Sequence, residues 1–403
     1  MREGSRVRPR LQAFALTLLL VGTLIPARGI PVVTLTAAML VPVLLWAVVT
    51  GLPVVHRAVR FAVVLAAVVA VPAFVTPPTN DYGSTKVSSF FLFTVPTAVA
   101  VMLLRDRRDV TTWAKVWVVS GCLLAIFALV GGVDPAGRAV GSDGASNPIW
   151  LARAIGSPAV ALLWLTYRRA LPRPVVIGAA VLLVAGLYAT GSRGPVLALA
   201  IATLVVITLA SPAARASRAA VVGLAAGIGG YFAVVFQWIP AASRFGAALY
   251  DPQGELEASQ RVELARPTID LIMANPGGVG FGHWADHAAI VVYRYPHNLF
   301  LEVFAEAGWI PGAVLVALLL WVVVRLWRSA RVEPAAVLTL ALLAFETMCV
   351  SVSGDLNART FFAVLTLGYV VSHWPVASAR PVAPDLSRSG WAAMPVGASG
   401  TRR

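Results

Sequence analysis

Apolar runs of about twenty residues recur along almost the whole chain, and they restrict its fold more than any other feature. A helix needs about 20 residues to cross the hydrocarbon core of a bilayer, and the runs are bounded by Pro, Gly and charge. The chain is 59% hydrophobic and 12% charged, whereas soluble domains carry about 25% charged residues. The sequence therefore predicts an all-α, polytopic integral membrane protein without a soluble catalytic module.

The boundaries of the runs predict about twelve transmembrane helices in one domain, residues 1–374. We expect them at residues 11–27, 31–50, 59–76, 87–104, 113–133, 148–167, 174–189, 195–209, 219–239, 299–327, 335–352 and 360–374. The basic stretch Arg2 to Arg10 precedes a retained first helix rather than a cleaved signal peptide, because the next run begins almost at once. Residues 375–403, rich in Ala, Pro, Ser and Arg, are predicted to form a disordered cytoplasmic tail.

The net charge of +14 indicates orientation rather than a nucleic-acid partner. Most basic residues fall in alternate short loops between apolar runs, so we expect those loops and both termini to face the cytoplasm. Cys122 and Cys349 lie within apolar runs, where a free thiol behaves as a small hydrophobe. They predict neither a disulfide framework nor a metal site.

One long loop, residues 240–296, is external in this topology, and function is expected there first. It includes polar, helical stretches and the glycine-rich turn Asn275 to Gly282, and it ends in Pro296-His297-Asn298 before an apolar run. The turn lacks the Lys and Ser/Thr of a P-loop. We predict instead a tight turn at which the backbone approaches a neighbour or a lipid head group.

His297 is the candidate general base. It precedes the N-terminus of a predicted helix, whose partial positive charge disfavours imidazolium, and a neutral imidazole can accept a proton. Asn298 is expected to cap this helix, and Glu302 and Glu306 follow one and two turns later. A packing or interfacial role for His297 stays open.

Arg193, in an external turn, and Arg261, in the long loop, would suit a diphosphate, because a guanidinium offers forked donors to phosphate oxygens. Ion-paired or snorkelling arginines are the alternative for both. Five further residues are expected to line the same cavity or to be interfacial: Asn147, Arg153, Asn298, Glu302 and Arg359. Metal and other cofactors are not expected, since His283, Asp286 and His287 are the nearest approach to a ligand cluster.

Several motifs occur together in a fixed order: Gly191-Ser-Arg-Gly194, Gln260-Arg261, the turn Asn275 to Gly282, and Pro296-His-Asn-Leu-Phe-Leu-Glu302 with Glu306-Ala-Gly308. In order and spacing they resemble the O-antigen ligase and O-antigen polymerase superfamily. The resemblance is strongest between residues 191 and 312, and the layout of many spans with one large external loop agrees over most of the chain.

The resemblance implies a glycosyltransferase of the bacterial cytoplasmic membrane that acts at its outer face. Such an enzyme moves a glycan from a polyprenyl-diphosphate carrier to the hydroxyl of a glycan or lipid-glycan acceptor, without metal or nucleotide. By the same resemblance, Arg193 and Arg261 hold the diphosphate and His297 activates the acceptor. Ligases and polymerases share these motifs, so the acceptor stays open.

Two other classes compete with this interpretation. A flippase or other transporter of lipid-linked oligosaccharides would bring charged or broken helices to the midplane and often an internal repeat, and no repeat is evident. Transferases that use polyprenyl-phosphate sugars generally need an acidic residue in the first external loop. Here that loop is about Arg28 to Ile30 and has no carboxylate.

Overall fold

The computed structural model describes residues 4–21, 55–133, 138–141, 147–210, 264–288 and 293–374. These residues form a helical protein with one short antiparallel hairpin, β1 (Gly132–Val133) and β2 (Ala139–Gly141). The helices of the first half are α1 (Gly4–Val21), α3 (Val55–Val75), α4 (Asp81–Ser89), η2 (Phe90–Thr94), α5 (Val95–Ala100), η3 (Val101–Leu103), α6 (Arg107–Val130), α7 (Pro148–Tyr167), α8 (Arg173–Ala189) and α9 (Arg193–Ala210). Residues 264–274 are also helical, and they are followed by α13 (Trp284–His287), α14 (Leu299–Ala307), α15 (Trp309–Ser329), α16 (Pro334–Ser353) and α17 (Arg359–Ser372).

Five helical segments in the described ranges are long and apolar enough to cross a membrane. They are Asp81–Leu103, Arg107–Val130, Pro148–Tyr167, Trp309–Ser329 and Pro334–Ser353, and five shorter apolar helices accompany them. The predicted all-α fold with several candidate membrane-spanning helices is thus confirmed. The expected spans 31–50 and 219–239 lie outside the described residues, and the total of about twelve stays a prediction.

The expected single span over residues 299–327 is wrong. The chain forms α14 and then α15, with Gly308 between them at a φ of +97°. A residue with a side chain rarely adopts this conformation, whereas glycine adopts it readily. An apolar run does not reveal such a break, because both helices contribute hydrophobic residues to it.

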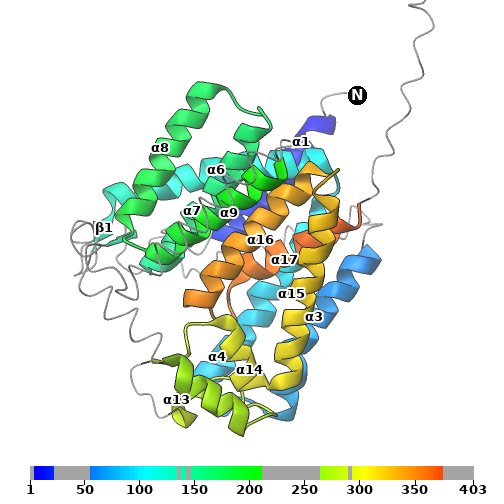
Figure 1. Cartoon of the computed structure of the whole chain (residues 1–403), viewed down its shortest axis with the longest axis vertical. Coiled ribbons are helices and arrows are strands. Elements are labelled where there is room, and N and C mark those ends of the chain that lie inside the picture. The colour runs from blue at the N-terminus through cyan, green and yellow to red at the C-terminus, as the bar shows by residue number, and fades with distance from the viewer. Residues whose placement is uncertain are drawn as a thin grey trace, which may run out of the picture.

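Helix α16 is the centre of the bundle. It packs against α9, α17, α7 and α15, and most of its side chains are buried. Helices α3, α6, α8 and α15 instead expose large apolar side chains, among them Val63, Leu123, Val181 and Leu320. Such side chains are suited to contact with lipid. Figure 1 shows α16 surrounded by the other helices.

The two ends of the bundle gather different loops. At one end Arg107 Nε lies 2.7 Å from Glu333 Oε2, and the Trp164 indole donates to the Pro334 carbonyl oxygen. These contacts join the loops that we expect in the cytoplasm. At the other end, low in Figure 1, α13 and α14 lie beside α4, away from the N-terminus.

Candidate functional site

His297 and Asn298 form the junction between the long loop and α14. Asn298 caps the helix as expected: its Oδ1 accepts from the backbone N–H groups of Phe300 and Leu301, while its Nδ2 donates to the Ser351 carbonyl oxygen of α16 over 2.9 Å. His297 has a φ of +55°. Backbone strain at a residue with a side chain is uncommon and concentrates at functional sites.

Aromatic rings surround the half-buried His297 imidazole. The Tyr295 ring lies 4.3 Å from it between centroids, and the Tyr293 ring lies 5.2 Å away in an edge-on arrangement. These contacts restrict the imidazole on two sides. They fit both a positioned base and a packed histidine, the two alternatives that the sequence left open.

The glycine-rich turn closes the other end of α14. Backbone N–H groups of Val279 and Gly280 donate to the carbonyl oxygens of Ala305 and Glu306, both over 2.9 Å. The carbonyl groups of a last helical turn have no partner within the helix, and here the turn supplies donors for two of them. The expected close approach of backbone to a neighbour is therefore confirmed.

The most completely buried charges of this region form a cluster of three residues, which we call the Lys86 cluster. Lys86 Nζ lies 2.6 Å from Glu302 Oε1 and 2.8 Å from Glu306 Oε2, and each of the three side chains is at most 1% exposed. Lys86 belongs to α4 and the glutamates to α14. Within the described ranges Lys86 is the only cation at ion-pair distance from either carboxylate.

Lys86 is not among the residues that the sequence predicts for the site, because the apolar run of this helix begins at Val87. The helix begins earlier, at Asp81, where Asn80 Oδ1 accepts from the Gly83 backbone N–H over 2.7 Å. An Asn followed by an acidic first turn is a known N-terminal signal. That signal would have placed Lys86 inside the helix.

A second buried ion pair links α7 to α16. Arg153 Nη2 lies 2.7 Å from Glu346 Oε2, and the Ser157 hydroxyl donates to Glu346 Oε1 over 2.6 Å. The Arg153 side chain is 11% exposed and that of Glu346 is fully buried. Arg153, expected to line a cavity, therefore has a carboxylate partner within the protein.

Arg193 opens α9 and lies beside the same end of α16 as Asn298. A Cβ added to its neighbour Gly194 would lie 3.0 Å from a methyl group of Val352, and Asn298 donates to the adjacent residue, Ser351. The residues next to Arg193 and His297 therefore lie against the same turn of α16. Arg261, the other expected diphosphate ligand, lies outside the described residues.

Arg359 opens α17 at this end. Its guanidinium carbon lies 5.5 Å from the centroid of the Phe93 ring, and its buried Nη1 has no hydrogen-bond partner among the described residues. Burial raises the pKa of the nearby Asp355 carboxyl above its ordinary value, although the charges of Lys86 and Arg153 lower it in part.

Asn147 caps the N-terminus of α7. It is exposed, and its Oδ1 accepts from the Ile149 backbone N–H as the N-cap of α7. His283 lies 3.1 Å from Asp286, and it also contacts the hydroxyl of Thr79 over 2.9 Å. No group of three metal-ligating side chains occurs in the part of the chain that the structure describes.

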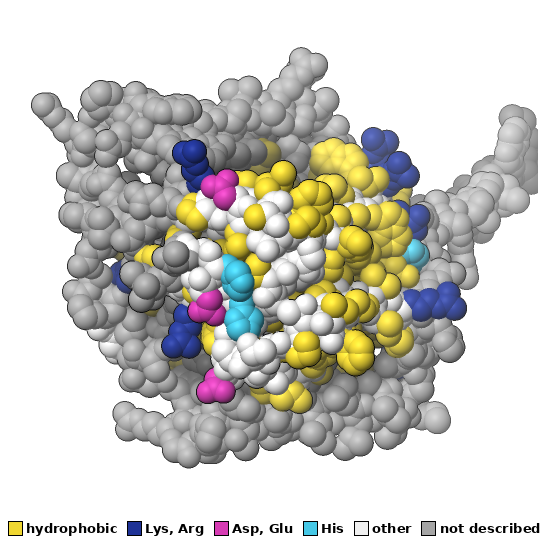
Figure 2. Space-filling view, turned by 90° about the horizontal axis from the view of Figure 1, so that it is seen from below, with side chains coloured by type: hydrophobic (Ala, Val, Ile, Leu, Met, Phe, Trp, Pro, Cys, Tyr) yellow, Lys and Arg dark blue, Asp and Glu magenta, His cyan; other side chains and the backbone are white. Residues whose placement is uncertain are grey.

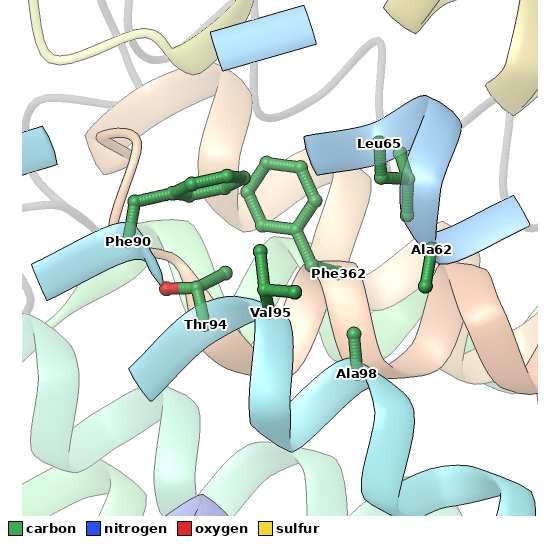
Figure 3. A pocket seen from close by; sticks show the side chains of 7 residues that line it. All are labelled: Ala62, Leu65, Phe90, Thr94, Val95, Ala98 and Phe362. Carbon is green, nitrogen blue, oxygen red and sulfur yellow. The ribbon is translucent and has the colours of Figure 1, made fainter. Parts of the chain in front are cut away.

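The lower end of the molecule combines polar and apolar surface. Figure 2 shows histidine and acidic side chains side by side, with a broad hydrophobic area next to them. A small apolar pocket lies between α3, the α4–α5 segment and α17 (Figure 3). Its lining is Ala62, Leu65, Phe90, Thr94, Val95, Ala98 and Phe362. This lining offers no charge to a substrate.

Comparison with known proteins supplies a family for the segment that carries these motifs. The family model described as O-antigen ligase matches residues 178–316, a stretch that includes Arg193, Arg261, His297 and both glutamates of the Lys86 cluster. No curated protein matches the chain. Lys86 itself lies outside the matched stretch.

Proposed function

We propose, from the match of residues 178–316 to the O-antigen ligase family model, that this chain transfers a glycan from a polyprenyl-diphosphate carrier to an acceptor hydroxyl. The reaction takes place at the outer face of the bacterial cytoplasmic membrane. Ligation and polymerisation of a cell-surface polysaccharide both fit this description, because they differ in the acceptor.

The observation that supports the proposal is that the residues next to Arg193 and His297, which are Gly194 and Asn298, both lie against the last turn of α16. Arg193 and Arg359 each open a helix, where the backbone N–H groups and the helix dipole favour an anion. A diphosphate bound there would have its negative charge neutralised by guanidinium and backbone donors. The His297 imidazole, next to Asn298 at this end of the bundle, is proposed to receive the proton.

The chemistry needs few groups. A diphosphate is a good leaving group, so the protein has to hold donor and acceptor in line, stabilise the charge that develops on the phosphate, and take one proton. His297 removes the proton from the acceptor hydroxyl as its oxygen attacks the anomeric carbon. The bond to the diphosphate oxygen breaks, and the configuration at the carbon inverts.

Glu302 and Glu306 are the obvious alternative bases, and their geometry argues against them. Both carboxylates are at most 1% exposed and each contacts Lys86. An acceptor hydroxyl would have to displace a buried ion pair to reach either one. We therefore assign the proton transfer to His297.

Reconstitution tests the function directly. Purified protein in liposomes that contain a polyprenyl-diphosphate glycan is expected to transfer it to a suitable acceptor, with identical rates in EDTA and in added Mg²⁺. Mass spectrometry of the product identifies the acceptor and the anomeric configuration. Activity that stops in EDTA and recovers with metal would contradict the metal-free mechanism.

The orientation is a separate prediction. We propose that α13, α14 and the start of α4 face outward, while the loops at Arg107 and Arg168 and both termini face the cytoplasm. In a variant without Cys122 and Cys349, a membrane-impermeant thiol reagent should label Ser84→Cys but not Arg108→Cys in intact cells. Both native side chains are exposed, so the reverse pattern would reject the topology.

A further inference from the structure

We propose that Lys86 is a positioning residue that fixes α14, and with it His297, through Glu302 and Glu306. The catalytic part of this inference rests on the proposed function, whereas its structural part does not. Lys86 lies outside the stretch that matches the O-antigen ligase family model. The positioning role of Lys86 is therefore inferred from its contacts in this structure and not from the family match.

The ends of α14 are held by hydrogen bonds. Asn298 joins the first turn to α16, and the glycine-rich turn bonds to the carbonyl groups of the last turn. The helix is only nine residues long, and Gly308 separates it from α15. Because α14 is not continuous with α15, the backbone of α15 does not fix the rotation of α14 about its axis.

The Lys86 cluster supplies that restraint. Glu302 and Glu306 are four residues apart, so they lie on one face of α14 in successive turns. One ammonium group contacts both of them, at 2.6 Å and 2.8 Å. Two contacts in successive turns oppose rotation of the helix about its axis as well as sliding along it. His297 directly precedes the capping residue of α14 and would move with either displacement.

Because the Lys86 cluster is buried, the two glutamates depend on the Lys86 ammonium to balance their charge. Without the ammonium, two carboxylates in successive turns would face each other at a site that water does not reach. Within the described residues, Glu302 Oε2 and Glu306 Oε1 have no hydrogen-bond partner, so the cluster offers no second means of stabilising them. We expect α14 to rotate toward water when Lys86 is lost.

Lys86 itself does not contact substrate in this arrangement. Its side chain is 1% exposed, and its Nζ is already engaged by both glutamates. Its effect on the reaction should therefore be transmitted by α14. This distinguishes Lys86 from Arg193, whose guanidinium is proposed to touch the diphosphate.

A charge cycle tests the proposal. Lys86→Met leaves both carboxylates uncompensated, whereas the triple variant Lys86→Met, Glu302→Gln, Glu306→Gln removes all three charges and keeps similar side-chain sizes. Lys115→Met is the matched control, because Lys115 is the other lysine of the chain and is exposed at the opposite end. Monodispersity in detergent establishes that each variant folds.

The first readout is the position of His297, independent of any activity. Diethyl pyrocarbonate modifies exposed imidazoles, and mass spectrometry measures the rate at the His297 peptide. We expect Lys86→Met to change this rate by about fivefold or more through local displacement, and the triple variant and Lys115→Met to stay near the wild-type rate. An unchanged rate in well-folded Lys86→Met would overturn the proposal. If Lys86→Met does not fold, Glu302→Gln decides, because it removes one of the two ion contacts and leaves the Lys86–Glu306 pair balanced: a changed rate at His297 supports the proposal, and an unchanged rate overturns it.

The second readout is transfer in liposomes. We expect Lys86→Met to lower kcat by about tenfold or more with an unchanged KM for the donor, and the triple variant to recover most of the loss. A raised donor KM that the triple variant does not restore would mean that Lys86 binds substrate itself, which overturns the positioning role. If the modification rates follow the expected cycle but wild-type protein transfers no glycan, the proposed function fails while the role of Lys86 in holding α14 stands.

Discussion

His297→Ala is expected to lower kcat for glycan transfer by about 10²- to 10⁴-fold, the usual contribution of a general base, while donor binding stays near the wild-type level. The reason is that the imidazole acts on the acceptor hydroxyl and the diphosphate is held elsewhere. Initial rates in liposomes and equilibrium binding of the polyprenyl-diphosphate donor measure the two effects separately. A well-folded His297→Ala protein with normal turnover would show that the histidine only packs against Tyr293 and Tyr295.

Arginine variants supply the contrast for this experiment. Loss of a charge-assisted hydrogen bond to phosphate costs about 1.5 to 3 kcal/mol, so Arg193→Ala and Arg261→Ala should weaken donor binding by about ten- to a hundredfold. Arg193→Lys should restore part of the binding, since it keeps the charge and loses the fork. If Arg193→Ala and the wild type bind the donor with equal affinity, Arg193 does not bind the diphosphate.

Gly278→Ala is expected to destabilise the protein by about 3 kcal/mol or more, because a strained φ and a backbone clash act together. Gly278 has a φ of +81°, and an added Cβ would lie 2.5 Å from the Glu306 carbonyl oxygen and 2.6 Å from the Gly308 nitrogen. All of these contacts are to backbone, which cannot turn aside. Thermal unfolding in detergent measures the loss.

The neighbouring glycine is the control. An added Cβ at Gly277 meets no atom within 4 Å, so Gly277→Ala should leave the unfolding temperature almost unchanged. Both substitutions add one methyl group to the same turn. If the two variants have the same stability, the turn does not hold the end of α14 in the way that the structure indicates.

Membrane location could be predicted from the sequence because it depends on local composition. A run such as Arg107–Val130 has to satisfy its backbone polar groups internally in lipid, and only a helix does so within one segment. The cap at Asn298 and the tight turn after Asn275 were also predictable. Both depend on residues within a few positions of each other.

The break at Gly308 was not predictable in this way. Apolar residues precede and follow it, so hydrophobicity continues through the site, and a glycine within a helical pattern does not by itself end the helix. The chain turns here because Pro276 and Gly278, from the preceding loop, pack against this glycine. That packing involves residues about thirty positions earlier and has no local signature.

The sequence by itself determined a helical fold with membrane-spanning segments, the match of residues 178–316 to the O-antigen ligase family model and the motifs that include His297 and Arg193, because each follows from hydrophobicity, local caps or motif order. Only the tertiary structure decided which charges meet. Lys86 and Glu306 are separated by 220 positions, and Arg153 and Glu346 by 193. A buried charge requires a partner, but its partner is set by which helices pack together, and that depends on the shape of the whole bundle.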